Sequence, residues 1–213
     1  MPDLLTCHEA AKALKIDLLN LVDILSIGDI QPAKPDGITG AEAWARYEEI
    51  RLSPDDIELI KAELRRRSFA DFKATYSDIY QPSTSHKARG LEFGPGWIDL
   101  LIDYADGLRA LNDRWKNEHA RLRWGKEKFG ALHLYSDYLL ATEPAVINMH
   151  RKAYRESLKT CQECGAPGRL RFGHAICLTL CEKHAHLVGE PDPTRDGIIL
   201  DLDAWMRGQR EEE

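Results

Sequence analysis

The chain has 213 residues, of which 43% are hydrophobic and 30% charged, and this composition excludes fibrous, collagen-like and wholly disordered proteins. The formal net charge of -6 argues against a general coat for nucleic acid or anionic lipid. No apolar run approaches the roughly 18 to 20 residues that cross a bilayer, and MPDLLTCHEAAKALK lacks a secretory pattern, so we expect neither a membrane partner nor secretion.

Residues 1–80 are predicted to form a helical module. A capping-box pair, Thr6 and Glu9, predicts the start of a first helix. A second helix is expected over residues 18–27, followed by a turn or short wing with the sequence DIQPAKPDG. A third helix is expected over residues 39–47, because its first residues repeat the capping-box pattern.

A long helix is predicted to begin after Ser53, an N-cap residue followed by a proline and two acids. Its apolar residues recur at steps of three and four, which predicts a helix that continues to about Tyr80. The segment QPSTSHKARGLEFG, residues 81–94, is rich in turn formers and is the predicted linker.

Residues 95–213 are predicted to form a second, α+β module. A helix begins at Pro95 and carries a regular apolar stripe. RLRWGKEKFGALHLYSDY predicts two strands joined by a glycine-containing turn, and residues 144–159 predict a basic helix. A short helix is expected over residues 200–207. The predicted fold class is therefore α+β, mainly helical.

Cysteines are concentrated near the end of the second module. Four of the five, Cys161, Cys164, Cys177 and Cys181, fall within 21 positions, and Cys7 lies far away. An odd total with tight clustering does not suit a disulfide framework and is typical of thiolates around a metal in a reducing compartment. We therefore expect a cytoplasmic protein.

The sequence predicts a zinc site made of a CxxC pair and a CxxH pair. The pairs are Cys161 with Cys164 and Cys181 with His184, and Gly165 lets the backbone fold closely around the first pair. Thiolate and imidazole donors select Zn²⁺ over Mg²⁺ or Ca²⁺, and four protein ligands leave no open position for catalysis. We expect a structural ion. A second possible set replaces His184 with Cys177, which lies in an apolar run typical of a strand.

Charge is distributed unevenly along the chain. Residues 1–80 and 182–213 each have a net charge of -5, whereas residues 121–172 have a net charge of +5. If the protein contacts a polyanion, this middle stretch is the expected surface; the alternative interpretation is that its charges are simply solvated. The predicted partner-binding residues are Arg121, Arg123, Lys126, Lys128, Arg151, Lys152 and Arg155.

Four motifs follow one another in the second module: GWIDLLIDYADGL, KEKFGALHLY, ESLKTCQECGAPGRLR and TLCEKHA. Their order over residues 95–186 resembles a group of uncharacterised bacterial and phage proteins with a GW-started helix, a KEKFG hairpin and a CxxCG…TLCxxH zinc knuckle. The resemblance implies that Cys161, Cys164, Cys181 and His184 are the ligands and that Cys177 is not. It implies no reaction. One departure is that HAICL stands where a tryptophan is common.

The N-terminal stretch LTCHEAAKALKIDLLNLVDILSIGDIQP is similar to the helix-turn-helix of excisionase-type and MerR-type proteins. Its second helix contains Asp23 and no lysine or arginine, and its polar candidates for reading bases are Asn20 and Ser26. Recognition helices normally bring cations to phosphates. The shape is therefore expected to serve packing or partner docking rather than DNA reading.

Catalytic patterns are scarce in this sequence. Phosphate-binding glycine loops, GxSxG, HExxH and the paired motifs of zinc deaminases do not occur. Asp99, Asp103 and Asp106 share a helix face and are expected to be solvated rather than to hold a metal. We therefore expect no small-molecule substrate and no enzyme activity; a zinc hydrolase is the third choice.

The resulting hypothesis is a zinc-stapled accessory or regulatory protein that binds nucleic acid or a nucleoprotein through its basic stretch. Its setting, phage or mobile-element biology, is implied by resemblance. The alternative is an inhibitor or immunity-type protein whose acidic surfaces bind a basic, nucleic-acid-handling protein.

Overall fold

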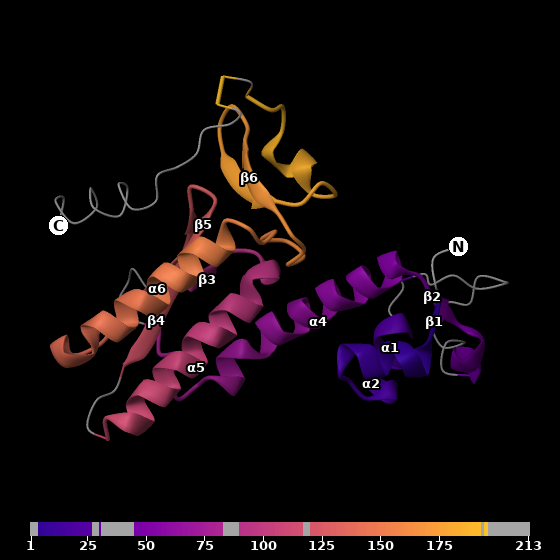
Figure 1. Ribbon diagram of the computed structural model, residues 1–213, viewed down its shortest axis with the longest axis horizontal. Coiled ribbons are helices and arrows are strands. Elements are labelled where there is room, and N and C mark those ends of the chain that lie inside the picture. The colour runs from indigo at the N-terminus through magenta and orange to yellow at the C-terminus, as the bar shows by residue number, and fades with distance from the viewer. Residues whose placement is uncertain are drawn as a thin grey trace.

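The computed structural model describes residues 4–26, 30, 45–82, 90–116, 120–192 and 194–195, and these form a mixed α+β fold that is mainly helical, as predicted. Figure 1 shows a small helical unit at the N-terminus, one long helix leading away from it, a lobe of two helices on a small sheet, and a compact knuckle above that lobe. The helices of the described residues include none that is long and apolar enough to span a bilayer.

The N-terminal unit packs two short helices against a two-stranded antiparallel ribbon. Its elements are β1 (Leu5–Thr6), α1 (Cys7–Leu14), α2 (Leu18–Ser26), η1 (Tyr47–Glu49) and β2 (Arg51–Leu52). The predicted capping box is present: the amide of Glu9 donates to Thr6 Oγ1, and the amide of Thr6 donates to Glu9 Oε2. Buried apolar side chains of both helices and β2 pack on Ile60 of the following helix.

Helix α4 (Pro54–Thr75) connects the N-terminal unit with the rest of the molecule. Its predicted start is confirmed, since Ser53 and Asp56 form a second capping box. The predicted continuation to Tyr80 is wrong. Beyond Thr75 the backbone turns. The amide of Leu122, in strand β4 (Arg121–Lys128), donates to the carbonyl of Ile79, and the amide of Gln81 donates to the carbonyl of Leu122. Backbone hydrogen bonds to β4 thus replace the hydrogen bonds that a longer helix would make.

The central lobe contains a three-stranded sheet in the order β3-β4-β5. Its elements are β3 (Leu91–Glu92), η2 (Pro95–Trp97), α5 (Ile98–Arg114), β4 (Arg121–Lys128), β5 (Ala131–Asp137), η3 (Leu140–Thr142) and α6 (Glu143–Ser157). The predicted hairpin and both helices are confirmed. Part of the predicted linker is a strand instead, because β3 pairs in parallel with Gly125 and Lys126 of β4.

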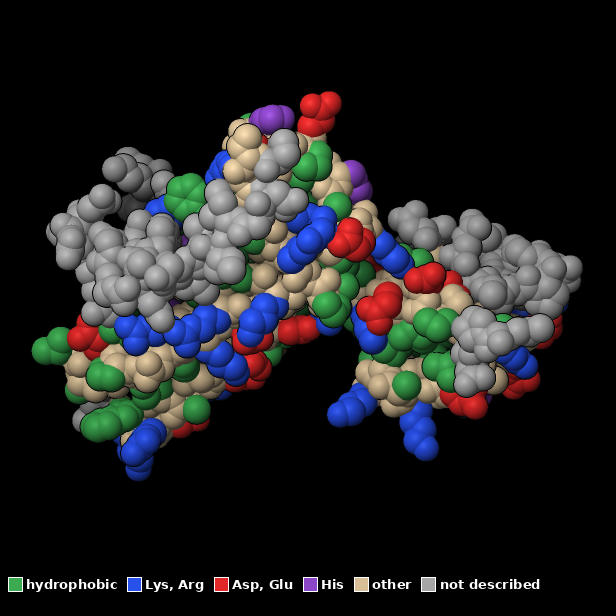
Figure 2. Space-filling model, turned by 45° about the horizontal axis from the view of Figure 1, so that its top comes forward, with side chains coloured by type: hydrophobic (Ala, Val, Ile, Leu, Met, Phe, Trp, Pro, Cys, Tyr) green, Lys and Arg blue, Asp and Glu red, His purple; other side chains and the backbone are tan. Residues whose placement is uncertain are grey.

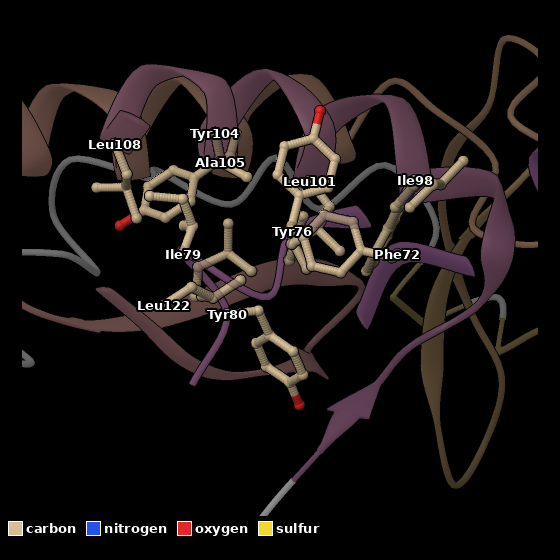
Figure 3. Close-up of a cluster of buried hydrophobic side chains, with 14 of the residues drawn as sticks. Phe72, Tyr76, Ile79, Tyr80, Ile98, Leu101, Tyr104, Ala105, Leu108 and Leu122 are labelled. Carbon is tan, nitrogen blue, oxygen red and sulfur yellow. The ribbon is translucent and has the colours of Figure 1, made fainter. Parts of the chain in front are cut away.

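The largest buried core lies where the end of α4 meets α5 and the sheet (Figure 3). Phe72, Tyr76 and Ile79 pack with Leu101 and other side chains of α5. The residues just before the boundary predicted at position 80 therefore belong to the core of the central lobe. The assignment of two domains itself stays a prediction.

The knuckle consists of an antiparallel hairpin and a short 3-10 helix: β6 (Arg169–Phe172), β7 (Cys177–Leu180) and η4 (Ala185–Val188). Its small core contains Cys161, Leu180 and Val188. Two predicted helices cannot be compared in full, since residues 39–44 and 200–207 lie outside the described part of the chain.

Candidate metal centre and basic face

The knuckle brings together four side chains whose ligand atoms all lie within 4.8 Å of one another: Cys161, Cys164, Cys181 and His184. Cys164 Sγ lies 3.8 Å from Cys181 Sγ, and His184 Nδ1 lies 3.5 Å from Cys161 Sγ and 3.3 Å from Cys181 Sγ. Tetrahedral Zn²⁺ with Zn–S of about 2.3 Å and Zn–N of about 2.05 Å requires S–S distances of about 3.8 Å and S–N distances of about 3.6 Å. The four residues could therefore hold a metal ion of this size.

Cys177 lies outside this cluster. It begins β7, where it pairs with Phe172, and burial raises the pKa of its thiol, with a further contribution from the charge of Glu127. The alternative ligand set of four cysteines is thus not assembled, whereas the set with His184 is. His186 Nδ1 forms a hydrogen bond of 3.2 Å with the backbone carbonyl of Lys183.

Two tight turns bring the four ligand side chains close together. The amide of Gly165 donates to the carbonyl of Cys161 at 2.8 Å, and Gly165 has the positive φ (+76°) that this turn requires. The amide of His184 donates to the carbonyl of Cys181 at 3.3 Å in the second turn. A hydrogen bond from Cys164 lowers the pKa of Cys161, and the same bond raises that of Cys164.

The GW motif packs against the turn that contains Cys161 and Cys164. The amide of Gly96 donates to the carbonyl of Gln162 at 2.7 Å, and Trp97 Nε1 donates to the carbonyl of Thr160 at 2.7 Å. A Cβ on Gly96 would overlap the carbonyl oxygen of Cys161. Gly96 is needed because the two backbones touch, and the buried Trp97 anchors the contact.

The KEKFG turn supports the knuckle from the other side. Gly130 has a φ of +76°, and its carbonyl accepts a hydrogen bond of 2.6 Å from the buried hydroxyl of Thr179 in the TLC motif. The carbonyl of Thr179 in turn accepts from the amide of Gln162 at 3.0 Å, next to the ligand Cys161. The motifs that are separated in sequence therefore form one contiguous unit around the metal centre.

Arg65 of α4 ties the metal centre to two helices. Its Nη1 donates to the carbonyl of Cys164 at 2.9 Å, and its Nε lies 2.8 Å from Asp99 Oδ2 of α5. Lys183, between the second pair of ligands, reaches Asp55 at the start of α4 at 2.8 Å. Sequence reasoning missed Arg65, because a contact 99 positions along the chain leaves no local pattern.

The three acids on α5 do not form a second metal site. Each has a partner: Asp99 pairs with Arg65, Asp103 with Lys152, and Asp106 with Tyr76 and Arg109. Among the residues that the structure describes, the Cys/His cluster is the one group with metal-binding geometry.

The seven predicted partner-binding residues are divided between β4 and α6. Arg121 contacts Gln81, Arg123 contacts Asp137 and Gln81, and Lys152 contacts Asp103. The ammonium groups of Lys126 and Lys128 lie over the rings of Trp124 and Phe129. Lys126 and Lys128 lie on one face of β4, opposite His133 and Ala131 of β5.

The remaining two predicted residues, Arg151 and Arg155, lie on α6, the helix whose Tyr154 contacts His133. The ring of Tyr154 lies 5.2 Å from that of His133 in an edge-on contact. Burial lowers the pKa of His133 to about 4, and the charges of Lys128, Lys126 and His150 add to the effect. We call Lys126, Lys128, Arg151 and Arg155 the basic face. Figure 2 shows lysine and arginine side chains at several places on the molecule, a number of them on the lobe at the left.

An aromatic pair beside the basic face was also missed from the sequence. Trp124 and Tyr135 stack in parallel across the hairpin, with ring centroids 3.6 Å apart and planes 4° apart, and Lys126 Nζ lies 5.6 Å from the Trp124 ring centre. The signal was present in the sequence, because both residues are equally distant from the Phe129–Gly130 turn and therefore pair across the hairpin.

The second helix of the N-terminal unit packs its polar side against α4. Asp23 of α2 lies 2.8 Å from Arg67, and Asn20 Oδ1 accepts from the same guanidinium at 3.5 Å. One of the polar residues considered for reading bases, Asn20, is thus engaged within the chain.

Comparison with family models, with curated proteins and with solved structures finds no match to this chain. The interpretation of the metal centre and of the basic face therefore depends on their geometry.

Proposed function

We propose that the ion at the metal centre is Zn²⁺ and that it is structural. Three thiolates and one imidazole would complete a tetrahedral coordination sphere, whereas catalytic zinc usually has three protein ligands and an open position. The ligand turns are tied to the GW motif, the KEKFG turn and Arg65 by hydrogen bonds. Zinc binding would contribute directly to the stability of this arrangement, with no turnover.

We propose further that the protein acts by binding nucleic acid, or a nucleoprotein, through the basic face. The observation that carries this proposal is that Lys126 and Lys128 of β4 lie opposite β5, whose His133 contacts Tyr154 of α6, the helix that carries Arg151 and Arg155. Cations gathered on one surface bind phosphates and release counterions, even on a chain with net negative charge.

The test is binding of the zinc-loaded protein to labelled oligonucleotides, measured by fluorescence anisotropy over a range of salt concentrations. We expect the logarithm of the affinity to fall linearly with that of the salt concentration. Lys126→Ala and Arg151→Ala should each reduce this slope by about 1. Lys73→Ala, at an exposed lysine near the end of α4, is the matched control and should leave the slope unchanged.

A wild-type protein that binds no nucleic acid at low salt would overturn the proposal. The inhibitor alternative would then be tested by capture of a basic protein partner, which should depend on acidic residues and not on Lys126 or Arg151.

A further inference from the structure

The three cysteine ligands of the metal centre differ in exposure. Cys161 is fully buried and Cys181 is 8% exposed, whereas Cys164 is only partly buried. A cysteine that ligates a metal is a thiolate, and peroxides oxidise accessible thiolates in preference to buried ones. Cys164 is therefore the ligand that a small oxidant in the solvent reaches first.

A second sulfur lies beside Cys164. Cys181 Sγ lies 3.8 Å from Cys164 Sγ and comes from the other turn of the knuckle. A disulfide requires these two sulfurs to approach each other by less than about 2 Å. Oxidation of Cys164 can therefore be followed by a bond to Cys181 that joins the two turns.

The two turns are held in place to different degrees. The turn of the CxxC pair accepts hydrogen bonds of 2.7 to 2.9 Å from Gly96, Trp97 and Arg65. The turn of the CxxH pair is closed by an amide hydrogen bond of 3.3 Å. Its exposed residues Glu182 and Lys183 form ion pairs at the surface, which contribute little to stability. The turn of the CxxH pair is therefore the one that can move when a disulfide forms.

We propose that Cys164 is a peroxide-sensitive site and that its oxidation releases the ion from the metal centre. This inference rests on the proposed zinc ion and adds a regulation of the same site. The Cys164 thiolate attacks one oxygen of hydrogen peroxide, so that an S–O bond forms, the O–O bond breaks and hydroxide leaves. The Cys181 thiolate then attacks the sulfur of this sulfenic acid, so that the S–S bond forms, the S–O bond breaks and a second hydroxide leaves.

The reaction removes two of the four ligands. Two electrons pass from the sulfurs to the peroxide, and Cys161 and His184 remain as ligands. Two protein ligands do not complete the tetrahedral sphere of a structural zinc, so Zn²⁺ should leave the oxidised protein. The contacts of the knuckle with Gly96 and Arg65 should then loosen, so that the redox state of the thiols controls the structure of the knuckle.

The test treats the zinc-loaded protein with hydrogen peroxide and follows zinc release with a chromogenic chelator. We expect one zinc ion to leave per chain as two of the five thiols disappear, and peptide mass spectrometry to find a disulfide between Cys164 and Cys181. Reduction with dithiothreitol in the presence of zinc should restore the metal content. Cys7 and Cys177 should stay reduced, because burial raises the pKa of both thiols.

The variant Cys164→His separates oxidation from metal binding. An imidazole can replace a thiolate as a zinc ligand, so this variant should still bind zinc, through two cysteines and two histidines. It lacks the accessible sulfur and should release zinc on the order of tenfold more slowly than wild type. Cys177→Ser, which leaves the four ligands intact, is the matched control and should release zinc at the wild-type rate.

The proposed function and this inference fail in different ways. If the purified protein binds no zinc, the proposed metal centre is wrong. If it binds zinc that peroxide does not release, or if the disulfide lies within the CxxC pair instead of between the two turns, the inference is wrong. Release of zinc from Cys164→His at the wild-type rate would also overturn it. If Cys164→His binds no zinc, the disulfide mapped in the wild-type protein decides.

Discussion

At the scale of single residues, two glycines of the GPGW segment are required by close approach of the backbone. A Cβ on Gly94 or on Gly96 would overlap backbone atoms of residues 161 and 162. Gly90, a few positions earlier, has nothing within 4 Å of the place where its Cβ would be. Gly94 and Gly96 therefore pack against the knuckle, although they lie more than sixty positions before Cys161 in the sequence.

We expect Gly96→Ala to destabilise the protein by about 1–3 kcal/mol, because the added methyl group pushes the Cys161 turn away from the GW segment. Gly90→Ala is the control and should change the free energy of unfolding by less than about 0.5 kcal/mol. Urea unfolding followed by circular dichroism measures both. Equal stability of the two variants would contradict the close packing described for Gly96.

At the scale of secondary structure elements, a buried polar network joins α5, β5 and α6. The hydroxyl of Tyr104 forms hydrogen bonds with Ser136 Oγ, at 2.8 Å, and with His150 Nε2. The rings of Tyr104 and His150 stack on each other. Burial lowers the pKa of His150 to about 4 and raises that of Tyr104 above its usual range. The contact between α5 and α6 thus depends on a neutral imidazole.

Stability should therefore fall in mild acid. Between pH 6.5 and about 4 the unfolded chain binds protons at His150 and His133 that the folded chain does not. The stabilisation is fully present above pH 6.5 and declines as the pH falls toward 4, by on the order of 1.4 kcal/mol per pH unit for each histidine. Thermal unfolding over this pH range measures it.

His150→Gln should flatten this pH profile, because glutamine does not titrate. His174→Gln, at an exposed histidine of the knuckle, should leave the profile as in wild type. A profile that stays unchanged in His150→Gln would mean that His150 does not contribute.

At the scale of the whole molecule, the metal centre lies where three segments of the chain meet. Arg65 and Asp55 of α4, the GW segment and the KEKFG turn all contact the knuckle through hydrogen bonds or ion pairs. The large core between α4, α5 and the sheet has its own buried side chains. Metal loss should therefore loosen the knuckle and its contacts first.

Cys161→Ser should lose bound metal, whereas Cys177→Ser, at a cysteine outside the cluster, should retain it. In hydrogen exchange, Cys161→Ser should lose protection at the amides of β6, β7 and Gly96, while the middle of α5 stays protected. Elemental analysis reports the metal. Loss of metal from Cys177→Ser would contradict the ligand set.

Local patterns alone determined much of this protein. The capping boxes at Thr6 and Ser53, the KEKFG hairpin and the CxxC and CxxH pairs were predictable because each depends on residues a few positions apart. The end of α4 at Thr75, the strand β3 and the contacts of Arg65 were decided by the tertiary structure. These features depend on hydrogen-bond partners that lie tens of residues away and reach their positions only when the chain folds.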